Sequence, residues 1–119
     1  MRSFILAMAC VFVTALPAAA ADIGGTYKIA GKNVDGSSYT GKAEITITSK
    51  NTCRISWNTG SVQNGICMRN GIAFSAAYSF SNGTVGLIIY EIEDDGSLKG
   101  LWTIADQAGV GEEILTPEN

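Results

Sequence analysis

The carboxylate side chains are the first groups in this sequence whose type and spacing could do chemistry. Four of them lie within five residues, at Glu91, Glu93, Asp94 and Asp95. Paired carboxylates can act as acid and base in glycoside hydrolysis. Turns also favour Asp, because its carboxylate bonds to the nearby backbone, and Gly96 follows directly. We therefore interpret this acidic cluster as a solvated turn and not as a catalytic site.

Other reaction chemistry has little support in the sequence. Glu112 and Glu113 form a second acidic pair, but the chain has no histidine, so a serine or cysteine nucleophile would lack its usual base. A metal site would have to be built without histidine, and the cluster at 93–95 lacks the alternating oxygen ligands of a dedicated calcium loop. We predict that the protein is not an enzyme and that it uses no metal or cofactor.

Aromatic side chains are the next candidates. The predicted site for a small apolar ligand consists of six aromatic residues: Tyr27, Tyr39, Trp57, Phe74, Tyr78 and Trp102. An eight-stranded barrel is just wide enough for side chains to fill its interior or to hold one small ligand. Filling is favoured, because a small domain loses much of its stability without a packed core. A ligand carrier stays the alternative.

The stretch 85–104 is the strongest hairpin signal in the chain. Two apolar runs flank Asp95-Gly96, and this pair predicts a two-residue type I′ turn that sets Ile89 opposite Trp102. One face is then expected to join the core: Leu87, Ile89, Leu98, Gly100, Trp102 and Ile104. The other face carries an exposed apolar stripe, the predicted binding site for an extracytoplasmic protein: Ile88, Tyr90, Ile92 and Leu101. Large exposed apolar patches usually mark interaction sites, although a loop or the C-terminal tail could cover this one.

The elements that must position these residues are short strands joined by tight turns. Beside the two strands of the hairpin, the pattern predicts strands at 25–31, 38–48, 52–58, 61–69, 72–80 and 110–115. Eight consecutive antiparallel strands protect their edges best by closing on themselves. The sequence therefore predicts an all-β, eight-stranded antiparallel up-and-down barrel, with an open sandwich as the alternative. Glycines within the strands fit the bends of a barrel: Gly41, Gly65, Gly86 and Gly100.

Two cysteines are expected to form a disulfide. Counting outward from a three-residue loop centred on Gly60 sets Cys53 directly opposite Cys67, and a bulge or a shorter loop would move the pairing by one residue. An even pair in an exported chain favours a bond over two free thiols. The pair is interpreted as structural.

Residues 1–21 have the features of a signal peptide. Arg2 precedes an apolar run, and four alanines at 18–21 predict cleavage after Ala20 or Ala21. The run is too short for a membrane span. We expect a single mature domain at 22–119, periplasmic or secreted, with seven basic and eleven acidic residues. The resulting net charge of about −4 argues against binding to nucleic acid or to anionic lipid.

Two resemblances follow from these motifs. The opening Gly25-Thr26-Tyr27 and the stretch 95–102 resemble the avidin and lipocalin class of small secreted barrels, although the biotin-binding side chains of avidins do not map onto this sequence. The stretches 53–57, 65–78 and 89–104 resemble an uncharacterised family of short exported proteobacterial proteins, some of them loosely labelled fibronectin-binding. The second resemblance implies a surface or periplasmic protein.

The expected function is non-enzymatic binding outside the cytoplasm. The leading hypothesis is a protein-binding module, such as an inhibitor, an adhesin or an accessory subunit, that uses the apolar stripe. The alternative is the carrier of a small apolar ligand inside the barrel.

Overall fold

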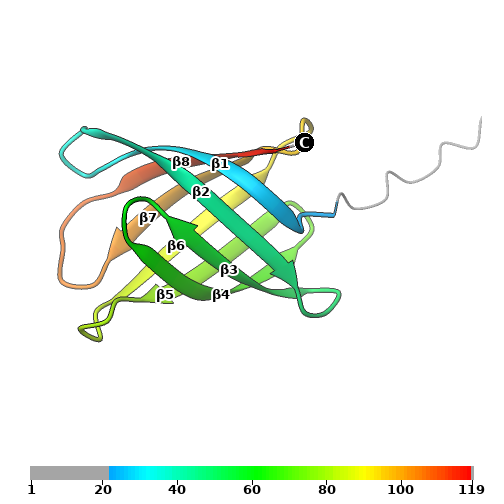
Figure 1. Cartoon of the computed structure of the whole chain (residues 1–119), viewed down its shortest axis with the longest axis horizontal. Helices are drawn as coiled ribbons and strands as arrows, with labels where there is room; N and C mark the ends of the chain where they lie inside the picture. The colour runs from blue at the N-terminus through cyan, green and yellow to red at the C-terminus, as the bar shows by residue number, and fades with distance from the viewer. Residues whose placement is uncertain (1–21, 119) are drawn as a thin grey trace, which may run out of the picture.

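The protein is a closed barrel of eight antiparallel strands (Figure 1). The computed structural model describes residues 22–118, and the predicted signal peptide lies outside them. The strands follow one another around the barrel, and β1 pairs with β8 to close it. Their bounds are β1 Gly25–Lys32, β2 Ser38–Ile47, β3 Thr52–Asn58, β4 Val62–Asn70, β5 Ala73–Ser79, β6 Val85–Ile92, β7 Leu98–Ile104 and β8 Gly111–Pro117. The prediction of an all-β, eight-stranded antiparallel barrel is confirmed.

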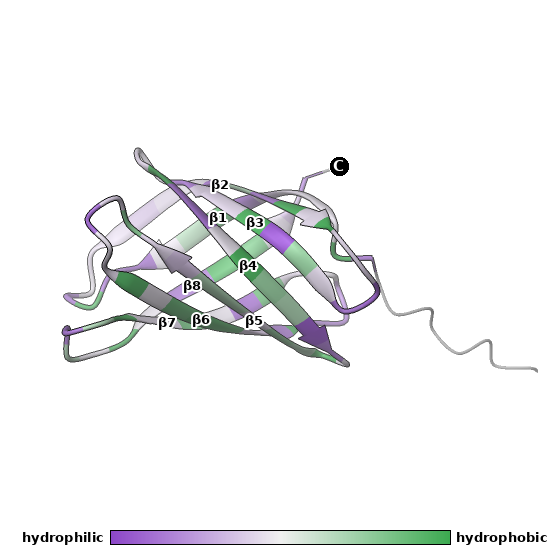
Figure 2. Cartoon of the chain, turned by 90° about the horizontal axis from the view of Figure 1, so that it is seen from below, coloured by the Kyte–Doolittle hydropathy of each residue, from purple (hydrophilic) through white to green (hydrophobic). Residues whose placement is uncertain are grey.

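Alternation along the strands separates the inside of the barrel from its outside. Successive side chains of a strand point to opposite faces of the sheet, and the burial of β6 alternates without a break. The buried aliphatic core lies inside the barrel and draws on most strands, with Ile29, Ile45, Ile55, Leu98 and Leu115 among its members. Figure 2 shows hydrophobic and hydrophilic residues in turn along the strands. On β6 the outer face is apolar as well, since Leu87 and Ile89 are exposed.

The β6–β7 hairpin has a different register from the predicted one. Ile88 pairs with Trp102 and Tyr90 pairs with Gly100, so β6 is shifted by one residue and its two faces are exchanged. The prediction that Ile88, Tyr90 and Ile92 face outward is therefore wrong. Their side chains are 2%, 4% and 7% exposed.

The physical reason for the shift lies in the turn. The Gly96 amide donates to the Glu93 carbonyl at 3.0 Å, and the Glu93 amide donates to the Ser97 carbonyl at 2.9 Å. This is a three-residue loop in which a type I turn is followed by a glycine bulge. Gly96 has a φ of 84°, and among the described non-glycine residues only Asp106 has a positive φ. A type I′ turn would need positive φ at Asp95 as well.

The same loop geometry occurs three times in the barrel. The β1–β2, β5–β6 and β6–β7 connections each place a glycine at a φ of 84–87°, at Gly36, Gly83 and Gly96. In each loop an Asp or Asn side chain accepts the backbone N–H two residues further on, as Asp95 does from Ser97 at 2.9 Å. The hydrogen bonds of Ser97 also hold the pKa of the Asp95 carboxyl below its usual range. The carboxylate of Asp95 is therefore engaged within the turn.

The disulfide joins β3 to β4 as predicted. Cys53 and Cys67 pair in register, their Cα atoms lie 4.9 Å apart, and both side chains are buried. In the chain-entropy model, a loop of this length gives a stabilisation of about 3 kcal/mol.

The described part of the chain, 22–118, contains no helix long and apolar enough to cross a membrane. Within the same residues, no group of three or more His, Cys, Asp or Glu side chains could hold a metal ion.

Candidate functional site

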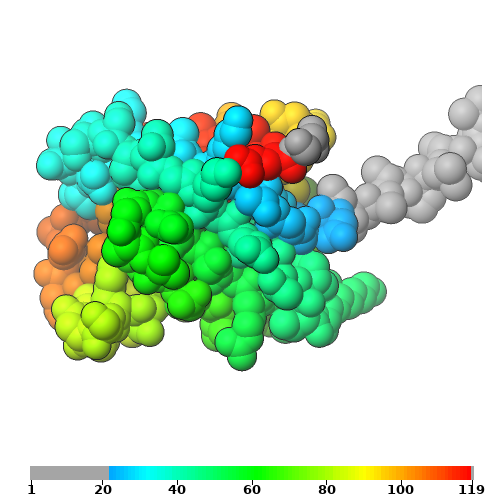
Figure 3. Space-filling model, viewed as in Figure 1, coloured from blue at the N-terminus to red at the C-terminus, as the bar shows by residue number. Residues whose placement is uncertain are grey.

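One end of the barrel opens into a cavity of about 340 Å³. Four loops surround this mouth: those that join β1 to β2, β3 to β4, β5 to β6 and β7 to β8. In Figure 1 these four loops lie together at the left end of the barrel, and Figure 3 shows them as separate lobes at that end. The cavity lies among Trp57, Tyr78, Trp102 and Glu113, so it reaches from the loops into the barrel itself.

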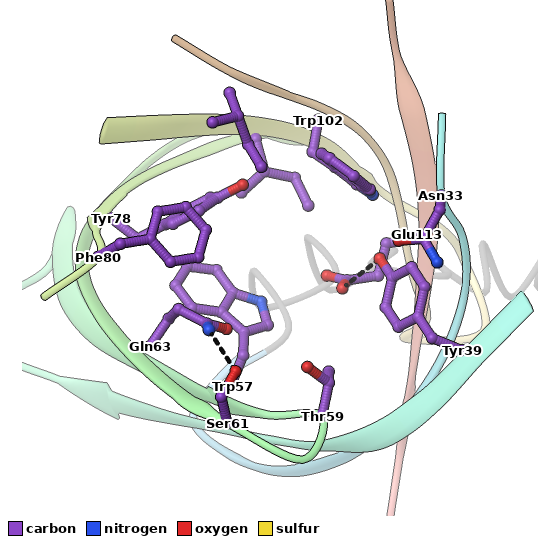
Figure 4. Close-up of a pocket in the computed structure, with 12 residues that line it drawn as sticks. Asn33, Tyr39, Trp57, Thr59, Ser61, Gln63, Tyr78, Phe80, Trp102 and Glu113 are labelled. Carbon is purple, nitrogen blue, oxygen red and sulfur yellow. Dashed lines mark hydrogen bonds between the residues drawn. The ribbon is translucent and has the colours of Figure 1, made fainter. Parts of the chain in front are cut away.

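Five of the twelve residues that line the cavity are aromatic (Figure 4). Trp57 and Tyr78 meet edge to face with their centroids 5.1 Å apart, and Tyr78 meets Phe80 in the same way at 5.6 Å. On the other side, Tyr39 faces Trp102 edge to face at 6.4 Å. These pairs hold one another in place and leave the space between the two groups open.

The six aromatic residues of the predicted ligand site fall into two groups. Tyr39, Trp57, Tyr78 and Trp102 line the cavity. Tyr27 and Phe74 instead belong to the buried core, where the Tyr27 hydroxyl donates to the Ile23 carbonyl. Four of the six residues thus line the cavity and two are packed in the core. A ligand-binding role for the six residues stays a prediction.

Glu113 lies at the inner wall of the cavity between two glycines. Gly31 of β1 pairs with it on one side, and Gly100 of β7 pairs with it on the other. A Cβ on Gly31 would lie 2.1 Å from Cζ of Tyr39, and a Cβ on Gly100 would lie 2.6 Å from Cδ1 of Tyr90. The two tyrosine rings therefore lie across the glycines and reach Glu113 from both sides. Aromatic rings are known to cover glycines in sheets in this way.

A hydrogen-bond chain ends on this carboxylate. The Trp57 Nε1–H donates to the Tyr90 hydroxyl at 3.1 Å, and that hydroxyl donates to Glu113 Oε2 at 2.5 Å. The Tyr39 hydroxyl donates to Glu113 Oε1 at 2.9 Å. Figure 4 shows the carboxylate pointing into the mouth beside Tyr39.

Burial raises the pKa of Glu113 and of the tyrosines around it. Glu113 is only 5% exposed, and the loss of hydration raises its pKa above the ordinary value, although the hydroxyl bonds oppose the shift. Desolvation, reinforced by the charge of Glu113, also raises the pKa of Tyr39 and Tyr90, and it raises the pKa of Tyr78 to about 12. The tyrosines around the carboxylate therefore stay protonated well above neutral pH.

Trp102 brings an unusual donor to the wall. Its buried Nε1 has no acceptor at ordinary hydrogen-bond geometry among the described residues, although its interaction with the Tyr39 hydroxyl lowers the pKa of that group against the effect of burial. The indole lies over Gly111, where a Cβ would approach its ring to 2.0 Å. A buried donor without a partner costs free energy.

Sequence reasoning missed the central residue of this site. Glu113 appeared only as half of an acidic pair, yet the alternation of β8 gave a usable signal. Two neighbouring carboxylates in a strand must point to opposite faces, so one of Glu112 and Glu113 had to face the interior. The polar side chains at the rim were also missed: Asn33, Thr59, Ser61 and Gln63.

The predicted partner-binding stripe does not exist on the outer surface. Of its four members only Leu101 is exposed, because the register places Ile88, Tyr90 and Ile92 inside the barrel. The outer face of the barrel carries a different apolar surface, which we call the outer patch: Ile66, Met68, Leu87, Ile89 and Leu101. The cross-strand pairs make it continuous, since Ile89 lies beside Leu101 on β7, and Leu87 lies beside Ala77, the neighbour of Ile66.

Comparisons with known proteins support the fold. No protein-family model and no curated protein matches this sequence. Among solved structures, the chain is similar to one described as "De novo design of a fluorescence-activating beta barrel", with a TM-score of 0.61 and 15% sequence identity. The match covers 80% of this chain and 93% of that one. At this identity the likeness shows the barrel fold alone.

Proposed function

We propose that this protein is an exported, non-enzymatic carrier that binds a small molecule in the mouth of its barrel. The observation that carries the proposal is the open cavity of about 340 Å³ between two groups of aromatic rings. Small-molecule sites are concave, mostly apolar and supplied with a few converging polar groups. The cavity has all three features, with Glu113, Tyr39 and Gln63 as the polar groups.

The cavity contrasts with the other end of the barrel. There Phe74 stacks on Tyr90 with their centroids 5.3 Å apart and is 1% exposed, so aromatic rings pack this part of the interior. The hollow at that end, of about 380 Å³, lies beside the β2–β3 loop and includes no aromatic side chain in its lining. A barrel whose only role was to present its outer surface could be filled along its whole length. The open half, walled by the only two tryptophans of the chain, supports the ligand carrier over the filled barrel that we favoured from the sequence.

The test of this proposal is a matched pair of tryptophan substitutions on β4. Gln63→Trp adds a bulky ring to the cavity wall, whereas Asn64→Trp adds it to the outer face of the same strand. Native mass spectrometry of protein purified from its producing cells should show a bound small molecule in the wild type and in Asn64→Trp, and none in Gln63→Trp. The same bound mass in Gln63→Trp, or none in the wild type, would contradict the proposal.

Export is supported by the apolar segment that ends in four alanines and by the disulfide. Disulfides persist in oxidising compartments. The intact mass of the protein from a secreting cell should equal that of a chain that begins at Ala21 or Asp22. A chain that retains Met1 would contradict export.

A second candidate function, protein binding, is supported by the outer patch. The partner we propose is a second copy of this chain, because a two-fold contact needs only one self-complementary surface and because no member of the patch is charged. Sedimentation equilibrium should then show a dimer that Ile89→Ser with Leu101→Ser converts to a monomer. Thr46→Ser, on the polar outer face of β2, is the control and should leave the dimer intact. A wild-type monomer at all concentrations would exclude this pairing.

A further inference from the structure

The charge of the cavity narrows the chemistry of its ligand. Of the twelve described residues that line it, Glu113 alone is an acid and none is a lysine or an arginine. A buried carboxylate without a basic partner is costly, and this one has only neutral hydroxyl donors on its two oxygens. The lining residues therefore give Glu113 no positively charged partner, and a cationic ligand could supply one.

Hydroxyl groups lie on both oxygens of Glu113, and their hydrogen bonds lower the pKa of this carboxyl against the effect of burial. The Tyr90 hydroxyl accepts the Trp57 N–H, so its single hydrogen is directed at Oε2. The Tyr39 hydroxyl lies 2.9 Å from Oε1 and 3.4 Å from the Glu112 carbonyl oxygen, so either atom can accept its hydrogen. Oε2 thus accepts from Tyr90, and Oε1 has the Tyr39 hydroxyl beside it, an arrangement that stabilises the charge of the carboxylate when Glu113 is ionised. Each oxygen keeps a further lone pair for a donor in the cavity.

The aromatic walls suit the same kind of ligand. A cation within about 6 Å of a ring face is attracted by the ring, most strongly by tryptophan. Two tryptophans and two tyrosines, Trp57, Trp102, Tyr39 and Tyr78, stand around the mouth with Glu113 (Figure 4). An apolar body bearing one positive charge would satisfy the rings and the carboxylate together.

We propose that the ligand of this cavity is an organic cation, an amine or a quaternary ammonium compound with an apolar or aromatic body. This inference rests on the proposed function, since it names the ligand class of the same site. The positive group contacts the Glu113 carboxylate, and the apolar body lies between Trp57 and Trp102. Anions are excluded by the charge of Glu113, and neutral molecules leave that charge uncompensated.

The test compares three probes that share one benzene ring: benzyltrimethylammonium, benzyl alcohol and benzoate. Because both tryptophans line the cavity, their fluorescence reports binding of each probe. We expect the cation to bind at least about tenfold more tightly than either of the others, which corresponds to about 1.4 kcal/mol, because only the cation is attracted both by the carboxylate and by the faces of the rings. Benzyl alcohol or benzoate binding as tightly as the cation would overturn the ligand class but leave the carrier standing. If none of the three probes binds, the result contradicts the proposed carrier function itself.

A pair of variants tests whether the tighter binding of the cationic probe depends on the Glu113 carboxylate. Glu113→Gln removes the charge inside the cavity, and Glu112→Gln removes the same charge from the outer face of β8. The tenfold preference should disappear in Glu113→Gln and persist in Glu112→Gln. Persistence in Glu113→Gln would overturn the proposal.

A pH titration of the wild type keeps the proposal testable if Glu113→Gln does not fold. Benzyltrimethylammonium has a permanent charge, so only the protein titrates. The groups that face Glu113 are Tyr39 of β2, Tyr78 of β5 and Tyr90 of β6, while β1 and β7 contribute glycines. The tyrosines stay protonated throughout, so affinity should fall as the pH is lowered through the pKa of Glu113, which burial raises. Constant affinity from neutral pH to about pH 4 would overturn the proposal.

Discussion

At the scale of single residues, the site depends on a carboxylate held between two glycines. Gly31 and Gly100 leave the space in which the rings of Tyr39 and Tyr90 lie, and the hydroxyls of those rings reach Glu113. None of the four neighbours carries a positive charge. The arrangement therefore keeps a buried charge solvated by hydroxyls and leaves it available to the cavity.

Glu113 should lower the stability of the protein as the pH rises. Its pKa in the folded state lies above its ordinary value, so the folded protein binds this proton more tightly than the unfolded chain. That contribution to stability is present below the ordinary pKa and is lost as the pH rises through the raised pKa. The free energy of unfolding of the wild type, minus that of Glu113→Gln, should fall across this window when measured by urea unfolding. A difference that is constant or grows with pH would contradict this account.

Gly31→Ala should break the contact between Tyr39 and Glu113. The added Cβ would lie 2.1 Å from the Tyr39 ring, so the ring must leave its place. We expect a loss of about 1–3 kcal/mol in the free energy of unfolding, the usual cost of overpacking. Ala30→Ser, at an exposed position of the same strand, is the control and should change stability by less than about 0.5 kcal/mol. Equal stability of the two variants would show that Tyr39 does not lie across Gly31.

At the scale of elements, one turn decides what the β6–β7 hairpin presents to the interior. The loop with a glycine bulge at Gly96 pairs Tyr90 with Gly100 and so brings Tyr90 to Glu113. A two-residue turn on Asp95-Gly96 would have turned Tyr90 outward. One residue of register therefore separates a cavity with a hydrogen-bonded carboxylate from a barrel without one.

Gly96→Ala should weaken this hairpin. Gly96 has a φ of 84°, where a residue with a Cβ is strained by about 1–2 kcal/mol. Urea unfolding should show a loss of that size, while Asp94→Ala, an exposed position of the same loop, should show almost none. Similar losses in both variants would mean that the φ of Gly96 is not what fixes the turn.

The β3–β4 and β6–β7 hairpins show how far the fold could be predicted from the sequence. The disulfide register followed from counting across Gly60, because a three-residue loop was the right choice there and the two cysteines offered a check. No such check existed at Asp95-Gly96, where a type I′ turn and a type I turn with a bulge share the same residues. The position of Glu113 was harder still to predict, since it depends on the pairing of β1 with β8, which are the first and last strands in the sequence.

At the scale of the whole molecule, the barrel combines a filled half with an open half. The buried rings and aliphatic side chains fill the end near Tyr27 and Phe74, and the aromatic pairs around Trp57 and Trp102 hold the mouth open. Closure of the sheet by β1 and β8 makes both halves one folding unit. A ligand bound in the mouth adds its binding free energy to the stability of that unit.

The tyrosines should report the integrity of the whole barrel at high pH. All four tyrosines of the chain have a raised pKa, with burial as the largest cause: Tyr27, Tyr39, Tyr78 and Tyr90. Their contribution to stability is present below the ordinary pKa of about 10 and is lost as the pH rises further, because the unfolded chain ionises first. The ultraviolet absorbance of tyrosinate should therefore stay low near pH 10 in the folded barrel, and it should rise only at higher pH, toward the pKa of about 12 of Tyr78 or as the barrel unfolds. In denaturant all four tyrosines should titrate near pH 10. If the tyrosinate absorbance of the folded protein rose near pH 10 while its circular dichroism stayed intact, the burial of these rings would be contradicted.

The central claim is that a small molecule binds inside the mouth of the barrel. A crystal structure of the protein grown with benzyltrimethylammonium tests it most directly. Our account predicts density for the ammonium group against the Glu113 carboxylate and for the benzene ring between Trp57 and Trp102. Density on the outer patch alone, or a mouth closed by the side chains that line it, would contradict the claim.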